Sequence, residues 1–300
     1  MNYQLAKIAG PTIITFALFL GGAAVHSQSG SPGRMLFAVW SGQTGKQPDS
    51  PILDPVALVT ASGFDEPLKY GSAKGKEAEA IYDTFEKAYL NSGQKYPLLF
   101  GGSEIGAVDV EAAVGISCES LTATVRPSVP LPNAQRALAA TSIQGLRLHT
   151  NWRQPNTTGQ RSEFLNAAAA YLTKKGVTGV LPSAIKLRNL RLTKVRLDGP
   201  NALGGSITFK DSTTKRNLFL VLGQGETNWD VDMASYHVTK DLEDYVDEAE
   251  EDFVDQLDLD SDGVDEIVTI SYYYESWDYA IYKEKDGKWE KVYKGGGGGC

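Results

Sequence analysis

Two segments of the chain repeat apolar residues with the period of an amphipathic helix. Between residues 74 and 91, Ile81, Phe85 and Tyr89 fall on one face of such a helix. From Ser162 to Lys175 the same period coincides with a run of alanines, which have the highest helix propensity. The sequence therefore predicts two main helices.

Most other apolar segments are short, rich in β-branched or aromatic residues, and bounded by polar turns, which is typical of strands. Lys285-Asp286-Gly287-Lys288 separates the last two, and its central Asp-Gly predicts a tight hairpin turn. These elements predict an α+β, predominantly β fold with antiparallel sheets. The expected strands cover residues 35–40, 56–60, 96–100, 107–114, 121–126, 146–152, 190–197, 206–209, 218–222, 267–273, 279–282 and 289–293.

A proline-rich segment divides this pattern into two regions. Residues 127–133 contain three prolines, which predict a stiff connector. We therefore expect an N-terminal α+β region over residues 28–133 and a C-terminal β-rich module over residues 134–300.

Residues 1–27 are typical of a secretory signal peptide. Lys7 precedes an apolar run from Pro11 to Val25, and Val25 and Ser27 are small residues at the −3 and −1 positions of a cleavage site. The run is shorter than the roughly 20 residues that a membrane-spanning helix needs. The alternative is an uncleaved anchor. We expect cleavage, no membrane span in the mature chain, and a secreted, periplasmic or cell-envelope location.

Export also bears on the two cysteines. An exported chain with an even number of cysteines generally pairs them, which predicts a disulfide between Cys118 and Cys300. The alternative is a buried Cys118 and a free thiol at Cys300.

Acidic residues are concentrated in one part of the chain. Of its 37 acidic residues, 14 lie between Asp241 and Glu266, a window without Lys or Arg. Leu242 and Phe253 belong to a rough helical spacing, so Asp241–Asp255 is expected to be a solvated helix face, with a docking surface for a basic partner as the alternative. The net charge of −8 argues against nucleic acid as a partner.

The end of this acidic window has the spacing of a cation-binding loop. From Asp258 to Glu266, carboxylates stand at positions 1, 3, 5 and 9, and Gly263 stands at position 6. Calcium takes six to eight oxygen ligands, which a tight loop supplies from alternate residues. An EF-hand would need Glu at position 12, where Thr269 stands, and a helix where residues 267–273 predict a strand. We expect a strand-flanked Ca²⁺ site, with a solvated acidic turn as the alternative.

The pattern D-x-D-x-D-G-x-x-[DE] followed by an apolar strand resembles the loop of FG-GAP/VCBS-type repeats, the units of integrin-like β-propellers. The resemblance covers about residues 190–300, and the tail after it is similar to that of uncharacterised secreted bacterial proteins. It implies one propeller-blade-like repeat module but not a full propeller, which needs several blades. The implied ligands are the side chains of Asp258, Asp260, Asp262 and Glu266, with Asp265 as a substitute for the last, and the backbone carbonyl of Val264.

Catalytic signals are sparse. Only His149 and His237 follow the predicted signal peptide, and no G-x-S-x-G motif is present.

Tyr272, Tyr274 and Trp277 are candidates for binding a carbohydrate or peptide, with core packing as the alternative. We expect a secreted Ca²⁺-binding protein with a structural or ligand-binding role towards a protein or glycan. The alternative is an exported hydrolase, glycan-directed, in which Ca²⁺ is structural.

Overall fold

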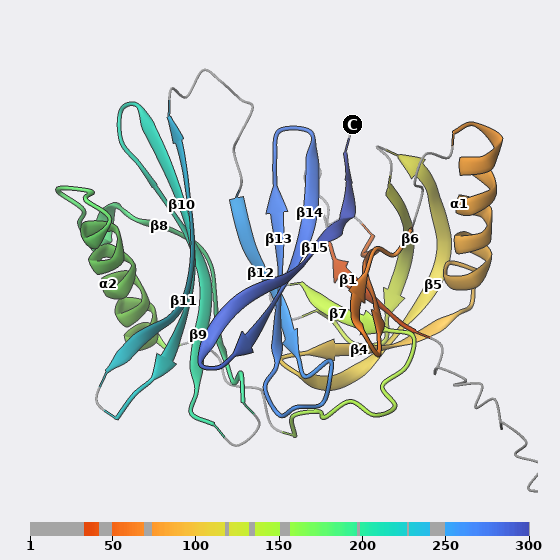
Figure 1. The fold of residues 1–300 in the computed structure, drawn as a ribbon, viewed down its shortest axis with the longest axis horizontal. Coiled ribbons are helices and arrows are strands. Elements are labelled where there is room, and N and C mark those ends of the chain that lie inside the picture. Colours follow the sequence, from red (N-terminus) through yellow and green to blue (C-terminus); the bar gives the residue numbers. More distant parts are fainter. Residues whose placement is uncertain are drawn as a thin grey trace, which may run out of the picture. The chain divides into compact units, whose positions relative to one another are not determined.

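In the computed structural model, all the described residues fall within one unit of the chain, Pro32–Cys300. Its described elements are two α-helices, one short 3₁₀ helix and 15 strands (Figure 1). The residues that the structure describes are 33–41, 50–68, 74–117, 120–131, 136–150, 157–196, 199–226, 228–240 and 250–299.

Six strands close into an antiparallel barrel. They are neighbours in the order β1-β7-β4-β5-β6-β2, and pairing of β1 with β2 closes the ring. A short strand, β3 (Gly63–Asp65), continues from β2 as a hairpin. The six barrel strands are β1 (Arg34–Trp40), β2 (Ile52–Thr60), β4 (Lys95–Phe100), β5 (Ser103–Ser117), β6 (Ser120–Pro127) and β7 (Ala137–Ala140).

Strand alternation gives β1 two buried faces. Along β1, Phe37 and Val39 belong to the core inside the barrel, whereas Leu36 and Ala38 belong to a core on its outside. Helix α1 (Lys76–Tyr89) packs Phe85 against the inner core. Both faces of β1 are therefore removed from water, which explains its uninterrupted apolar sequence.

Two four-stranded antiparallel sheets follow in the chain. The first, the outer sheet, has the order β11-β10-β9-β8, and the second, the middle sheet, has the order β12-β13-β14-β15. The strands of the outer sheet are β8 (Lys186–Thr193), β9 (Ala202–Lys210), β10 (Thr214–Gln224) and β11 (Trp229–Lys240). The strands of the middle sheet are β12 (Glu250–Leu257), β13 (Glu266–Tyr272), β14 (Ser276–Lys285) and β15 (Lys288–Gly299).

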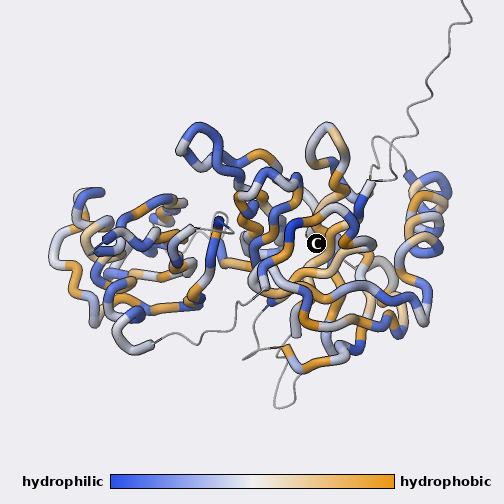
Figure 2. The backbone as a smooth tube through the Cα atoms, turned by 90° about the horizontal axis from the view of Figure 1, so that it is seen from below, coloured by the Kyte–Doolittle hydropathy of each residue, from blue (hydrophilic) through white to orange (hydrophobic). Residues whose placement is uncertain are grey.

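The middle sheet is buried on both faces. Val268 and Ile270 join the core that it shares with the barrel, while Ile267 joins the core that it shares with the outer sheet. Helix α2 (Thr158–Lys174) covers the other face of the outer sheet with Phe164 and Leu172. Apolar segments accordingly run through the interior of these layers (Figure 2).

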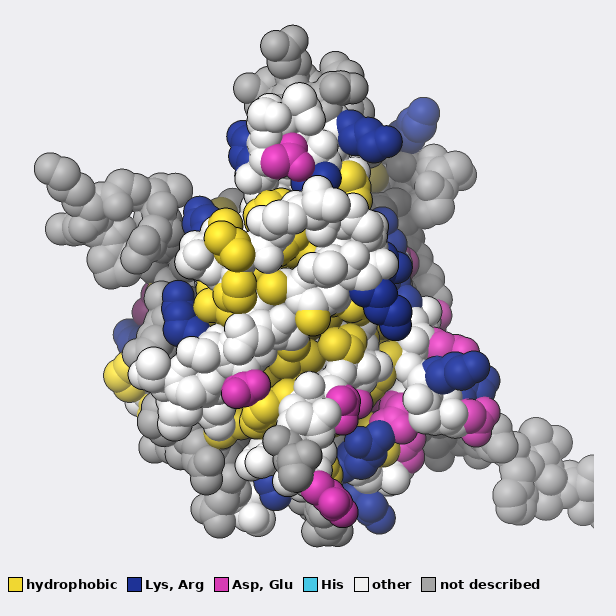
Figure 3. Space-filling view, turned by 90° about the vertical axis from the view of Figure 1, so that its left-hand side faces the viewer, with side chains coloured by type: hydrophobic (Ala, Val, Ile, Leu, Met, Phe, Trp, Pro, Cys, Tyr) yellow, Lys and Arg dark blue, Asp and Glu magenta, His cyan; other side chains and the backbone are white. Residues whose placement is uncertain are grey.

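The side that carries α2 leaves hydrophobic side chains at the surface (Figure 3). Leu181, which follows α2, and Val231 and Val238 of β11 are among the exposed large apolar residues. Neither α-helix in the described part of the chain is long and apolar enough to cross a bilayer.

These observations confirm a β-rich fold with two main helices and antiparallel sheets. Two local predictions are wrong. The end of the acidic run, from Glu250 to Asp255, is strand β12 and not helix. Of the strand expected at 146–152, the described residues 146–150 form only an isolated bridge at Arg147. Strand β7 follows the predicted boundary at residue 133 and is hydrogen-bonded between β1 and β4.

Several predictions fall on residues outside the described ranges. They concern the signal peptide at 1–27, the pair Cys118 and Cys300, and the part of the acidic run from 241 to 249. They stay predictions, as does the propeller-blade-like character of the C-terminal module.

Candidate cation-binding loop

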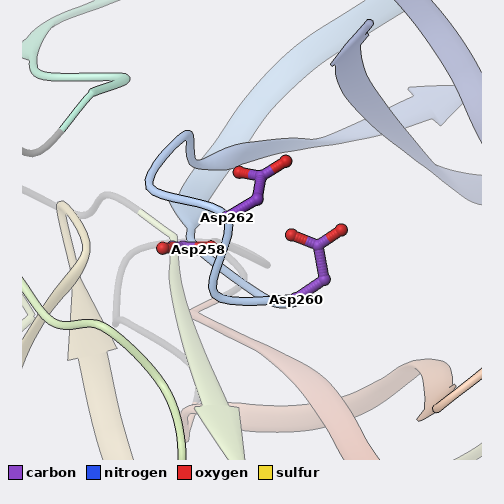
Figure 4. A group of neighbouring side chains, drawn as sticks. All are labelled: Asp258, Asp260 and Asp262. Carbon is purple, nitrogen blue, oxygen red and sulfur yellow. The ribbon is translucent and has the colours of Figure 1, made fainter.

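The acidic loop connects β12 to β13 and turns sharply at Gly263. Gly263 has a φ of 95°, a conformation that side chains rarely adopt. Its backbone N–H donates to Asp258 Oδ2 at 2.9 Å, and the N–H of Val264 donates to Asp262 Oδ1 at 2.9 Å. Carboxylate oxygens of Asp258, Asp260 and Asp262 thereby come within 4.8 Å of one another, a group that could hold a metal ion (Figure 4).

Glu266, the first residue of β13, is a fourth carboxylate at this loop but is not one of the three whose oxygens lie within 4.8 Å of one another. Its side chain is 1% exposed, and its Oε2 accepts a hydrogen bond from the N–H of Leu259 at 2.8 Å. Burial, reinforced by the charges of Asp260 and Asp262, raises the pKa of Glu266 to about 8. Burial also raises the pKa of Asp258. The loop is therefore an environment that disfavours uncompensated negative charge.

Two carboxylate oxygens of the loop are buried without a hydrogen-bond donor among the described residues. They are Asp258 Oδ1 and Glu266 Oε1. Buried polar atoms are nearly always partnered, so each unsatisfied oxygen requires an explanation. A cation bound between them would provide one.

An ammonium group from β14 already lies at the loop. Lys283 Nζ contacts Asp260 Oδ2, lies 2.9 Å from Asp262 Oδ2, and lies 3.5 Å from Glu266 Oε1. Burial by itself would lower the pKa of Lys283, but its hydrogen bonds to Asp260 and Asp262 outweigh this effect and raise the pKa. Nothing in the local sequence indicated that Lys283 reaches the loop, because the contact depends on the pairing of β13 with β14.

Asp265 points away from the loop, which argues against its use as a substitute for Glu266. Its carboxylate faces His149, whose Nε2 lies 2.8 Å from Asp265 Oδ2, and both side chains are buried. The backbone N–H of Asp265 donates to the carbonyl of Val195 at 2.8 Å. The role of Asp265 is thus to hold the loop against neighbouring segments.

Three acids of β12, Glu251, Asp252 and Asp255, are buried between the layers rather than solvated, which corrects the expected helix face. Asp255 is fully buried and pairs with Arg191 at 2.7 Å. The Arg191 guanidinium lies 4.0 Å from the centre of the Phe100 ring and 4.9 Å from that of Phe253. Arg191 therefore links the outer sheet, the middle sheet and the barrel through one buried cation.

Asp252 extends this buried network. It receives a hydrogen bond from Arg188 Nη2 at 2.9 Å and lies 3.6 Å from Arg136 Nη1. Arg188 belongs to β8, and Arg136 directly precedes β7. Asp252 and Asp255 are therefore already paired with arginines of this chain. In the described part of the acidic run, the alternative of a docking surface for a basic partner has no support.

A Ser-His-Glu group lies at the interface of the outer and middle sheets. Ser235 Oγ is 3.2 Å from His237 Nε2, and Glu251 Oε2 is 3.6 Å from the same nitrogen. In a catalytic triad the hydroxyl and the acid contact different ring nitrogens. This geometry is therefore that of a buried hydrogen-bond cluster around Glu251 and not that of an activated serine.

The three candidate binding aromatics do not form one surface. The OH of Tyr272 accepts a hydrogen bond from Arg136 at 2.6 Å in the interior, whereas Tyr274 is 65% exposed. Trp277 donates from Nε1 to Asp54 Oδ2 at 2.8 Å and also lines a pocket. Only Trp277 has a place that suits ligand binding.

That pocket lies beside the last strand of the middle sheet and has a volume of about 310 Å³. Its lining includes two carboxylate residues, Glu66 and Asp278, together with Trp277 and the glycines from Gly296 to Gly299. Glu66 Oε2 accepts a hydrogen bond from the N–H of Gly296 at 2.9 Å. Of the lining residues that the pocket description uses, the sequence indicated only Trp277 as a candidate for binding; Glu66 and Asp278 could not be paired with it, because they come from distant segments.

No family model matches the chain, and no significant similarity is found to curated proteins or to solved structures. The resemblance of residues 258–266 to FG-GAP/VCBS-type loops stays a prediction that rests on those residues alone.

Proposed function

We propose that residues 258–266 bind Ca²⁺ and that the protein is a secreted calcium-binding protein with a structural or ligand-binding role. The observation that carries the proposal is Asp258 Oδ1, a buried carboxylate oxygen of the loop that accepts no hydrogen bond from the described residues. Glu266 Oε1 also accepts no hydrogen bond and has only the Lys283 ammonium at 3.5 Å. Calcium prefers oxygen ligands and accepts irregular geometry. The four strands that follow one another in the middle sheet are also what a single propeller-blade-like module would contain.

Calcium would be held by the side chains of Asp258, Asp260, Asp262 and Glu266, with the carbonyl of Val264 as a further ligand. Its role is structural, because the loop joins two strands of the sheet on which both other layers pack. Binding to the folded loop then adds directly to the free energy of unfolding. A loop outside the cell meets calcium at concentrations that fill even weak sites.

The test is a calcium titration of the purified mature chain. We expect the melting temperature to rise with millimolar Ca²⁺, to fall back with chelator, and to respond less to Mg²⁺, which demands stricter octahedral geometry. Asp260→Asn should abolish the rise. Asp83→Asn, the same change at an exposed position of α1, should leave it intact. A melting temperature that is insensitive to calcium and chelator in the wild type would exclude the proposal.

A second candidate function, ligand binding or glycan hydrolysis, is favoured by the pocket beside β15. Its volume is in the range of small-molecule sites, and two carboxylates near one ligand are what glycoside hydrolysis requires. We would screen glycans and hydrolase substrates against the wild type, Glu66→Gln and Asp278→Asn. Binding or turnover that is lost in these variants supports this role, and activity that is equal in all three places it elsewhere.

A further inference from the structure

The acidic loop carries its own counter-ion. Lys283 Nζ is placed against Asp260, Asp262 and Glu266, which are three of the four side chains that would hold the metal. We infer that Lys283 is an intramolecular competitor of calcium: its ammonium and the metal ion occupy the same carboxylates in turn, and calcium binding displaces the lysine. This inference rests on the proposed calcium site.

The geometry makes the two occupants mutually exclusive. Each oxygen ligand of calcium lies about 2.3–2.6 Å from the ion. Two of the proposed ligands, Asp262 Oδ2 and Glu266 Oε1, now face Lys283 Nζ at 2.9 and 3.5 Å. A divalent cation at that point would lie beside the ammonium at a separation at which like charges repel strongly. The lysine must therefore leave before the carboxylates can close on the metal.

The lysine is able to leave without disturbing the fold. Tyr282 pairs with Ile267 across β13 and β14, so strand pairing holds the backbone of Lys283 beside Glu266 whether or not its side chain contacts the loop. Its side chain is 26% exposed, which leaves solvent on one side. A lysine side chain has a flexible four-carbon stem and a compact ammonium group. Rotation about the bonds of the stem can therefore move the charge from the loop into water while the strands stay paired.

The ammonium satisfies the loop only in part. It reaches Asp260, Asp262 and Glu266, but Asp258 Oδ1 is buried and has no hydrogen-bond donor in the described residues. Calcium, with six to eight ligands, can engage all four carboxylates at once. The lysine therefore keeps the loop folded when calcium is absent, and calcium still has an advantage when it is abundant. The consequence is a site with reduced affinity, suited to high calcium concentrations.

The test compares Lys283→Met with Lys285→Met. Lys285 lies two residues further along the same strand, is exposed, and contacts no loop carboxylate among the described ion pairs. By calorimetry, Lys283→Met should bind Ca²⁺ at least tenfold more tightly than the wild type, and Lys285→Met should match the wild type. In chelator, Lys283→Met should melt at a lower temperature than the wild type, because the loop has lost the ammonium that pairs with three of its carboxylates.

A measurement on the wild type avoids dependence on the variants. N-hydroxysuccinimidyl acetate modifies exposed lysines, and mass spectrometry measures the extent of modification at each site. Modification of Lys283 should increase several-fold when Ca²⁺ replaces chelator, while modification of Lys285 should not change. Modification of Lys283 that is the same in both conditions would overturn the inference even if calcium binds.

The remaining outcomes separate the inference from the calcium proposal. Equal calcium affinity in the wild type and Lys283→Met refutes competition but leaves the calcium site standing. Equal tightening in Lys283→Met and Lys285→Met shows a general effect of net charge and also refutes it. If neither the wild type nor Lys283→Met binds Ca²⁺, the calcium site itself is wrong and Lys283 is a permanent ion-pair partner.

Discussion

The buried carboxylate of Glu251 provides a prediction in which structure and pH dependence are directly linked. Glu251 is 3% exposed and accepts hydrogen bonds from Ser235 Oγ at 2.5 Å, Thr269 Oγ1 at 2.6 Å and Tyr282 OH at 2.8 Å. Burial would raise its pKa, but His237, the charge of Lys291 and these donors outweigh burial and lower the pKa from 4.5 to about 2. The folded state thus favours the ionised form.

The magnitude follows from linkage. Lowering the pKa from 4.5 to about 2 corresponds to about 3 kcal/mol of stability at neutral pH, since a tenfold change in proton affinity is worth about 1.4 kcal/mol. Because the folded pKa is the lower one, this stability is complete above the unfolded pKa and is lost as the pH falls towards 2. Between pH 6 and pH 3, about 2 kcal/mol of it should disappear.

The assay is urea unfolding of the wild type and Glu251→Gln from pH 7 to pH 3. At pH 7 the variant should be less stable by about 3 kcal/mol, because a neutral amide replaces the charge that three hydroxyls solvate. The difference should shrink by about 2 kcal/mol by pH 3. Thr269→Val, which removes one donor and keeps the acid, should show a smaller loss. A difference between wild type and Glu251→Gln that is constant with pH would refute the reasoning.

Three further perturbations test other parts of the fold. Asp54 is fully buried, and burial raises its pKa to about 6, so its ionised form destabilises the protein as the pH rises through 6. Asp54→Asn should therefore stabilise by about 3 kcal/mol at pH 8 and by little at pH 4 in urea melts; equal effects at both values would contradict this. Arg191→Met leaves Asp255 buried without its cation and should cost about 3–5 kcal/mol, whereas Arg126→Met, whose side chain is 70% exposed, should cost under about 1 kcal/mol. Comparable losses in thermal melts would mean that Arg191 does not link the layers. Gly297→Ala places a Cβ 2.2 Å from the carbonyl of Trp277 at a φ of 74°, whereas Gly179→Ala has a φ of 69° and open space around it. The first should lower the melting temperature clearly more than the second, and equal shifts would show that only the backbone conformation matters.

Local patterns were sufficient for the parts of the fold that local chemistry determines. Helix α2 begins with a capping box between Thr157 and Gln160, and its alanine run lies within the predicted range. The predicted hairpin between β14 and β15 turns at Asp286 and Gly287, which have φ of 53° and 75°. Positive φ at both positions is the reason that Asp-Gly is favoured in such turns.

The barrel could not be predicted from the same kind of pattern. Its closure depends on pairing of β1 with β2 and β7, and Ala137–Ala140, the sequence of β7, has no periodicity that distinguishes a strand from a helix. Short buried strands lack the alternation of half-buried ones, because both of their faces are apolar.

The acidic run shows how charge can mislead when partners are distant in sequence. Asp252 and Asp255 looked like solvent-facing residues, since charged residues are seldom buried without a partner. Their partners, Arg188 and Arg191, lie on β8, 64 residues earlier in each case. Only the packing of the outer sheet on the middle sheet brings the charges together, so the local pattern predicts a helix face where strand β12 lies.

The placement of the candidate loop gives a bound ion more influence than a surface turn would have. Ser261 Oγ donates to the carbonyl of Gly145, and the N–H of Asp265 donates to the carbonyl of Val195. Gly145 lies in the segment between β7 of the barrel and α2, and Val195 lies just after strand β8 of the outer sheet. A cation that fixes the carboxylates fixes both anchoring contacts with them. Loss of the cation should therefore loosen the junction of three layers rather than a single hairpin, and hydrogen exchange near residues 145 and 195 is where that coupling should be observed.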